Sequence, residues 1–148
     1  MNLFTILAVA VVILIIAAGV FFGLKRRPKE LKTDRFQEQW QQLQKLLADK
    51  TQWASAILDA DKLLDEALKK RHIRGKSMGE RMVHAQRIFS DNDGVWFGHK
   101  LRNKIDTDPE AKLKENEVKE ALLGIRQALK DLGALPSASK KTEDKDDK

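Results

Sequence analysis

The chain has no cysteine, no tyrosine and only three prolines among its 148 residues. The absence of cysteine excludes disulfide frameworks, thiolate zinc sites and cysteine nucleophiles. Beyond residue 24 there are also few β-branched residues, which argues against a β-sandwich or a β-barrel. The composition therefore favours a helical protein.

Charge is absent from one long segment, residues 3–24 (LFTILAVAVVILIIAAGVFFGL). As a helix this segment extends over about 33 Å, and the hydrocarbon core of a bilayer is about 30 Å thick. A cleaved signal peptide has basic residues before a shorter apolar core, whereas here the basic residues follow a long one. We therefore expect residues 1–27 to form an uncleaved transmembrane anchor with its basic flank.

Basic residues dominate the segment directly after the apolar run. Residues 25–35 hold six basic and two acidic residues, and so they account for four of the chain's six net positive charges. Under the positive-inside rule, Lys25, Arg26 and Arg27 lie at the cytoplasmic membrane surface. The expected protein is therefore a single-pass protein of the cell membrane, with its N-terminus outside and its C-terminal domain in the cytoplasm.

The rest of the chain divides into a linker (28–35), a folded body (36–134) and a charged tail (135–148) that we expect to be disordered. Apolar residues recur at helical spacing through the body. This pattern predicts an all-α fold in which a single N-terminal transmembrane helix precedes a four- to five-helix antiparallel bundle. The expected core consists of Trp40, Leu43, Leu47, Ile57, Leu64, Met82, Phe89, Leu101, Ile105, Leu122, Ile125 and Leu129.

Local signals indicate where some of these helices begin and end. Ser77 and Glu80 have the spacing of a capping box, which predicts a helix that starts there and carries Phe89 on its apolar face. Residues 90–94 are typical of a turn by composition. Gly133 has the position of a residue that ends the last helix.

Two short motifs resemble ligand-binding loops but lack residues that such loops need. Residues 75–77 (GKS) resemble the end of a phosphate-binding loop, but Lys70 stands where a second glycine is required. Residues 91–94 (DNDG) resemble part of a calcium loop, but the glycine is misplaced and no glutamate stands at the twelfth position. The three histidines have no metal-ligand spacing. We therefore expect no metal and no cofactor.

The polar residues that most resemble a site lie in the run HKLRNK (99–104). His99, Arg102 and Asn103 fall within about one helical turn, so they can share a face. They are candidates for a binding site or a dimer contact. The alternative is a hydrogen-bond network that joins neighbouring helices.

The same run resembles the helix-end signature of HEPN-type domains, which are small helical bundles of prokaryotic defence and RNA-processing systems. The wider pattern at 54–70, 75–82 and 91–105 resembles short membrane-anchored proteins of Saccharibacteria-like candidate-phyla bacteria. The resemblance covers about residues 36–134. It implies a homodimer and, in catalytic members, cleavage of RNA through its 2′-hydroxyl by an arginine and a histidine of both chains.

Carried onto this chain, the HEPN arginine is Arg102, and the resemblance implies a histidine at 107, 108 or 109. Those positions hold Thr107, Asp108 and Pro109. Threonine does not titrate near neutral pH as histidine does, so the acid–base group is missing. We therefore assign no catalytic residue and expect a degenerate site.

Three functions remain as hypotheses. The first, which the missing histidine favours, is a non-catalytic interaction module that binds a second copy or another protein. The second is a membrane-tethered ribonuclease that uses Arg102 and His99. The third is binding of RNA or a nucleotide without cleavage, through Arg102 and the basic residues Arg71, Arg74 and Lys76.

Overall fold

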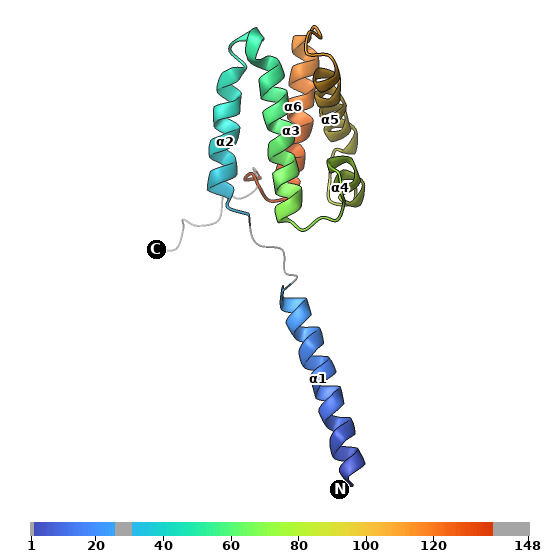
Figure 1. Ribbon diagram of the computed structural model, residues 1–148. Helices are drawn as coiled ribbons and strands as arrows, with labels where there is room; N and C mark the ends of the chain where they lie inside the picture. Colours follow the sequence, from blue (N-terminus) through green and yellow to red (C-terminus); the bar gives the residue numbers. More distant parts are fainter. Residues whose placement is uncertain (1, 26–30, 138–148) are drawn as a thin grey trace, which may run out of the picture.

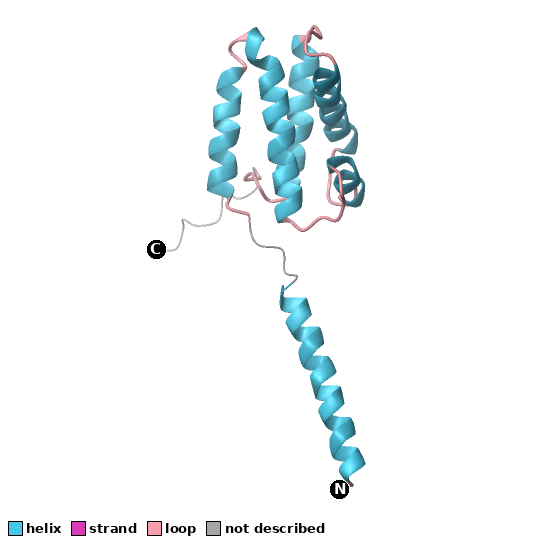
Figure 2. Ribbon diagram, viewed as in Figure 1, coloured by secondary structure: helices cyan, strands magenta, loops and turns pink. Residues whose placement is uncertain are grey.

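A computed structural model describes residues 2–25 and 31–137, and every regular element in these two ranges is a helix (Figure 2). The six α-helices are α1 (Leu3–Lys25), α2 (Thr33–Leu46), α3 (Trp53–Lys70), α4 (Met78–His84), α5 (Asn92–Thr107) and α6 (Glu115–Asp131). A 3₁₀ helix, η1 (Lys50–Gln52), connects α2 to α3. The predicted all-α fold is confirmed.

Helix α1 is long enough and apolar enough to cross a membrane. The side chains of residues 3–21 are all exposed, so none of them contributes to the buried core of the body. A bilayer accommodates an exposed apolar helix of this length. Lys25 is the last residue of α1, whereas Arg26, Arg27 and residues 28–30 lie outside the described residues.

The five other helices form the body, and α3 lies at its centre. Helix α3 contacts α2, α4, α5 and α6, while α5 and α6 make the most extensive contact of any pair. Among the long helices of the body, α3 runs antiparallel to α2, α5 to α3, and α6 to α5 (Figure 1). Consequently the N-terminus of α2, the α3–α4 connection and the C-terminus of α6 share one end of the body, and the α2–α3 and α5–α6 connections share the other.

Glycines allow α5 and α6 to approach closely. A Cβ atom on Gly124 of α6 would lie 2.2 Å from the backbone of Gly94 at the start of α5. A Cβ atom on Gly98, one turn further along α5, would lie 2.9 Å from the side chain of Ile125. Backbone therefore packs directly against backbone at this crossing, which fixes how α5 is rotated toward α3.

The predicted core is confirmed at eleven of its twelve positions, and the twelfth, Leu47, is half-buried against the same cluster. The body is longer than 36–134 at both ends. Thr33 is already helical, so α2 includes the last residues of the expected linker. Leu135 is 5% exposed and its amide donates to the carbonyl of Leu129, so it belongs to the core and not to the tail. Residues 138–148 of the tail lie outside the described residues.

Two helix boundaries differ from the expectation. Helix α4 ends at His84, and Phe89 reaches the core from the turns that follow it. Residues 92–94 are the first turn of α5, because the Asp91 side chain accepts a hydrogen bond from the amide of Gly94 and caps the helix. The capping role of Ser77 is confirmed by the 3.2 Å bond that it accepts from the amide of Glu80. Gly133 has a φ of 77° after the end of α6, as expected.

Two adjacent leucines of α6 test the packing of the body. Leu122 is 6% exposed and Leu123 is 64% exposed. We expect Leu122→Ala, and likewise Leu64→Ala in α3, to lower the free energy of unfolding by about 2–5 kcal/mol, because each leaves a cavity. Leu123→Ala should change it by less than about 0.5 kcal/mol.

The measurement is urea unfolding of the full chain in detergent micelles, followed by tryptophan fluorescence. All three tryptophans, Trp40, Trp53 and Trp96, lie in the body, so the signal reports the body and not α1. Equal losses for Leu122→Ala and Leu123→Ala would show that the buried face of α6 is assigned wrongly.

Candidate functional site

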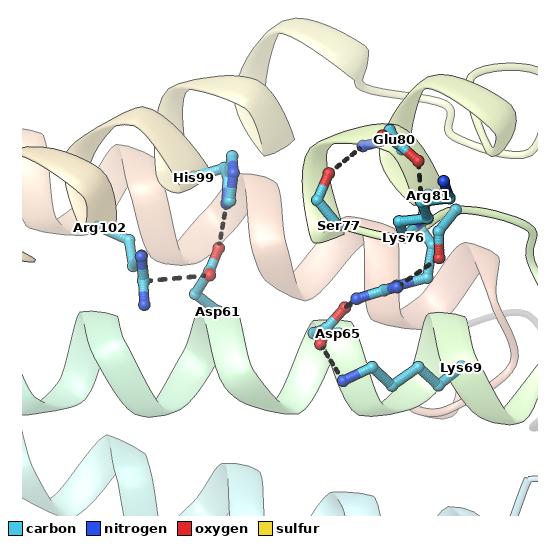
Figure 3. A network of polar contacts seen from close by, with 10 residues as sticks. Asp61, Asp65, Lys69, Lys76, Ser77, Glu80, Arg81, His99 and Arg102 are labelled. Carbon is cyan, nitrogen blue, oxygen red and sulfur yellow. Dashed lines mark hydrogen bonds and ion pairs between the residues drawn. The ribbon is translucent and has the colours of Figure 1, made fainter.

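The candidate residues lie on the side of α5 that faces α3. Val95, Leu101 and Ile105 are buried in the core, and this buried stripe sets the rotation of α5. His99 and Arg102 occupy the neighbouring strip, one turn apart, and point toward α3 (Figure 3). The Trp96 and His99 rings pack in a T-shaped arrangement, with 6.0 Å between the ring centroids.

Asp61 of α3 is the residue on which His99 and Arg102 converge. Its side chain is 6% exposed, and its Oδ1 accepts a 2.9 Å hydrogen bond from Nδ1 of His99. Nε of Arg102 lies 3.6 Å from the other carboxylate oxygen. A buried carboxylate needs such partners, because leaving its charge unpaired costs several kcal/mol. The three side chains therefore join α3 to α5.

Arg102 has further partners, and Asn103 lies at the edge of the group. Nη1 of Arg102 donates to Oδ1 of Asn103 over 3.0 Å and lies 3.4 Å from the Asp106 carboxylate. Asn103 itself is exposed. Its side chain bonds to Arg102 and, unlike His99 and Arg102, does not pair with Asp61 in the described part of the chain. Of the three candidates, the structure thus brings two to a common buried partner and leaves the third on the rim.

A second carboxylate of α3 joins it to α4. Asp65 accepts a 2.8 Å hydrogen bond from Nε of Arg81 and forms a 2.6 Å ion pair with Lys69 (Figure 3). Burial alone would raise the pKa of Asp65, but the hydrogen bonds from Lys69 and Arg81 together lower it below its ordinary value. Arg81, only 7% exposed, also donates to the carbonyl of Gly75 over 2.8 Å.

These two clusters border a groove of about 640 Å³ between α3, α5 and the start of α4. Its polar lining contains four carboxylates, two cations and one histidine: Asp59, Asp61, Asp65, Asp106, Lys62, Arg102 and His99. An excess of carboxylates repels a phosphate group. Within the described ranges, no three His, Asp or Glu side chains are arranged to hold a metal ion.

The arrangement has one feature of acid–base chemistry. A carboxylate that accepts from Nδ1 of a histidine fixes its tautomer, so that Nε2 can accept a proton. Cleavage of RNA would also require cations that stabilise a developing phosphorane charge. Arg102 is the cation that shares Asp61 with His99, and it also lies beside Asp106. The Asp61–His99–Arg102 cluster therefore has the geometry of a clamp, that is, a set of polar contacts that joins α3 to α5, more than that of a phosphate-binding site.

The positions at which the HEPN resemblance implies a histidine lie elsewhere. Thr107 is the last residue of α5, and its hydroxyl donates to the carbonyl of Asn103 over 2.9 Å. Thr107, Asp108 and Pro109 are all exposed, at the end of α5. They do not contribute to the lining of the groove that contains Arg102.

Sequence reasoning missed Asp61, the centre of the cluster. A signal for it exists, because Asp61 lies four residues after Ile57 and three before Leu64, in the stripe that faces the core. A charged residue at a core-facing position requires a partner. The identity of that partner, 38 residues further along, follows only from the packing of α5 on α3.

Comparisons of the chain with protein-family models, with curated proteins and with solved structures give no match.

Asp61→Asn tests the clamp. We expect the variant to lower the free energy of unfolding by about 2–4 kcal/mol, because His99 and Arg102 lose a buried charged partner. The matched control is Asp59→Asn, which neutralises an exposed carboxylate on the same helix and the same groove. The control should change stability by less than about 0.5 kcal/mol in the tryptophan assay. A loss for Asp61→Asn no larger than that of the control would mean that Asp61 does not join the helices.

Proposed function

We propose that this protein is a membrane-anchored interaction module without catalytic activity, whose helical body lies on the cytoplasmic side. The observation that carries the proposal is an open apolar hollow between α2 and α6. It measures about 330 Å³ and its apolar lining consists of Trp40, Leu47, Trp53, Val118, Leu122 and Leu123. A concave apolar surface with an exposed leucine at its edge is typical of a protein contact.

The hollow lies in the half of the body that is remote from the start of α2. Leu47 follows the end of α2, Trp53 begins α3, and Val118 lies in the first turn of α6. The indole N–H of Trp53 donates to the carbonyl of Leu47 over 3.0 Å and so holds the wall in place. A partner can therefore approach this surface away from the connection to the anchor.

The charges around the hollow indicate the chemistry of the partner. Lys119 and Arg126 line it, and the Lys50 ammonium lies 5.7 Å from the centre of the Trp53 ring. The acidic residue in the lining is Glu115. Its pKa is lowered by the hydrogen bond from Lys119, by the charge of Lys119 and by the charge of Lys50. The hollow and its rim thus carry three cations and one carboxylate, so the fitting partner is an apolar segment of another protein that carries acidic residues.

The anchoring part of the proposal rests on α1 and on the sequence that follows it. The positive-inside rule, applied to Lys25, Arg26 and Arg27, supports a cytoplasmic body. The HEPN-like motif supports a helical interaction domain whose catalytic histidine is missing. A ribonuclease is the less favoured proposal, because acidic side chains outnumber basic ones in the groove beside Arg102.

A photoreactive benzophenone amino acid at position 123 tests the interaction module. In the full chain, within the cells that produce it, we expect one discrete protein adduct whose cross-linked peptide is apolar with acidic residues. The control position is Val83 of α4, which is also exposed but lies outside the hollow. Arg126→Glu should reduce the yield at position 123 several-fold.

Equal yields at positions 83 and 123, or adducts with lipid or RNA alone, would contradict this proposal. An adduct with a second copy of the chain would replace the acidic partner by a homodimer.

An RNA-cleavage assay tests the absence of catalysis. We expect the purified full chain to leave a mixed single-stranded RNA intact, because no titratable group stands at positions 107 and 109 and carboxylates surround Arg102. Thr107→His should yield weak cleavage at most. Cleavage by the natural chain that disappears in Arg102→Ala, with tryptophan-monitored unfolding unchanged, would establish a ribonuclease instead.

A further inference from the structure

The turn between α3 and α4 concentrates positive charge. Residues 69–76 (KKRHIRGK) contain five lysines and arginines and no acidic residue. A basic run of this kind is often a solvated loop with no fixed shape. In this fold, however, the run has a defined conformation, and it lies at a defined end of the body.

Hydrogen bonds and packing hold this turn in a defined conformation. The amide of Ile73 donates to the carbonyl of Leu68 over 3.0 Å, and the Ile73 side chain packs against the core. At the other end, the buried Arg81 donates to the carbonyl of Gly75, and the amide of Lys76 donates to Glu80 over 2.7 Å (Figure 3). Gly75 has a φ of 147°, and a Cβ there would lie 2.6 Å from the amide nitrogen of Arg81. The cations are therefore presented on a preformed surface.

Three of the five cations have no acidic partner. Lys69 pairs with Asp65 and Lys70 with Glu66, both on α3. Arg71, Arg74 and Lys76 form no ion pair within the described part of the chain, and the side chains of Arg74 and Lys76 are exposed. Their charge is available to an external anion.

The fold places the turn at the end of the body that is connected to α1. Helix α2 leads away from that connection and α3 returns to it, so the turn lies at the same end as the start of α2 (Figure 1). Residues 26–32 separate α1 from α2. A segment of that length spans at most about 25 Å even when fully extended. The turn is thus confined to the neighbourhood of any membrane that holds α1.

The α5–α6 connection, at the opposite end of the body, has a net negative charge. Residues 106–117, which end α5 and begin α6, contain five acids and two lysines. Anionic lipids attract the basic end and repel the acidic one. The charge distribution therefore favours one orientation of the body on an anionic surface.

We propose that Arg71, Arg74 and Lys76 dock the body onto the anionic lipid headgroups of the membrane that holds α1. This inference rests on the proposed anchoring. Each cation near an anionic leaflet strengthens binding about fivefold, so three of them suffice to orient a body that is already tethered. Docking leaves the hollow between α2 and α6 directed away from the lipid.

The test uses the full chain in two kinds of vesicle, phosphatidylcholine alone and phosphatidylcholine mixed with phosphatidylserine. Because the chain has no cysteine, His72→Cys introduces a single labelling site in the turn, and Thr51→Cys introduces one at the far end. A fluorophore at each site reports contact with lipids that carry a nitroxide on the headgroup. Flotation with the neutral vesicles, which requires α1 and no charge, measures the anchoring separately.

We expect strong quenching at position 72 in the anionic vesicles, weak quenching there in neutral vesicles, and weak quenching at position 51 in both. The combined variant R71E/R74E/K76E should reduce quenching at position 72 to its neutral-vesicle value. The matched control K45E/K104E/K112E changes the net charge equally on exposed lysines elsewhere and should leave quenching unchanged. Added salt should weaken the contact, since it screens exposed charges.

Equal quenching at position 72 in both vesicle types would overturn the docking, and so would equal effects of the two charge variants. The turn would instead be a nucleic-acid surface if single-stranded RNA bound to the chain in neutral vesicles, lost that binding in R71E/R74E/K76E, and no lipid contact occurred. Failure to float with neutral vesicles would overturn the anchoring and the docking together, whereas flotation without quenching would overturn the docking alone.

Discussion

The pairing of two carboxylates on α3, the buried Asp61 and the half-buried Asp65, is the constraint on which the arrangement of the body depends. Asp61 and Asp65 lie one turn apart on a helix that every other helix of the body contacts. A charge removed from water is tolerated only when it is paired and hydrogen-bonded. Asp61 takes its partners from α5 and Asp65 takes its partner Arg81 from α4, so the two acids determine which helices cover this side of α3.

The Asp65–Arg81 pair also shapes the end of the body that is connected to α1. Arg81 is paired with Asp65 and also holds the backbone of Gly75, so the basic turn has a fixed shape. At the far end, the apolar hollow lies between α2 and α6, where α3 begins. In the arrangement that we propose, α1 tethers the body, the basic end lies near that tether and the apolar hollow lies far from it. Electrostatic attraction would then orient the body on an anionic surface, and the hydrophobic effect would favour an apolar partner in the hollow.

The helices and their buried faces were accessible from periodicity, because Trp40, Ile57, Leu101 and Ile125 each belong to a stripe that repeats with the helical turn. Helix lengths were harder to predict. Phe89 has the spacing of the helix that starts at Met78, yet that helix ends at His84 and turns bring Phe89 to the core. Apolar spacing alone does not distinguish a continued helix from turns that bury the same side chain.

The candidate site was likewise predictable only in part from the sequence. The grouping of His99 with Arg102 was predictable, since residues three apart on a helix are neighbours. That both would bind Asp61 was not, because the pairing depends on the close approach of α5 to α6 at Gly98 and Gly124, which sets the rotation of α5.

By itself the sequence determined the uncharged segment that forms α1, the all-α composition of the body, and the apolar face of each helix. These are local properties, set by residue type and by spacing within one or two turns. Only the tertiary structure decided that Asp61 meets His99 and Arg102, and that residues 69–76 lie at the end of the body connected to α1. Such relations join residues far apart in the chain, and they follow from the order and direction in which the helices pack, which no local pattern specifies.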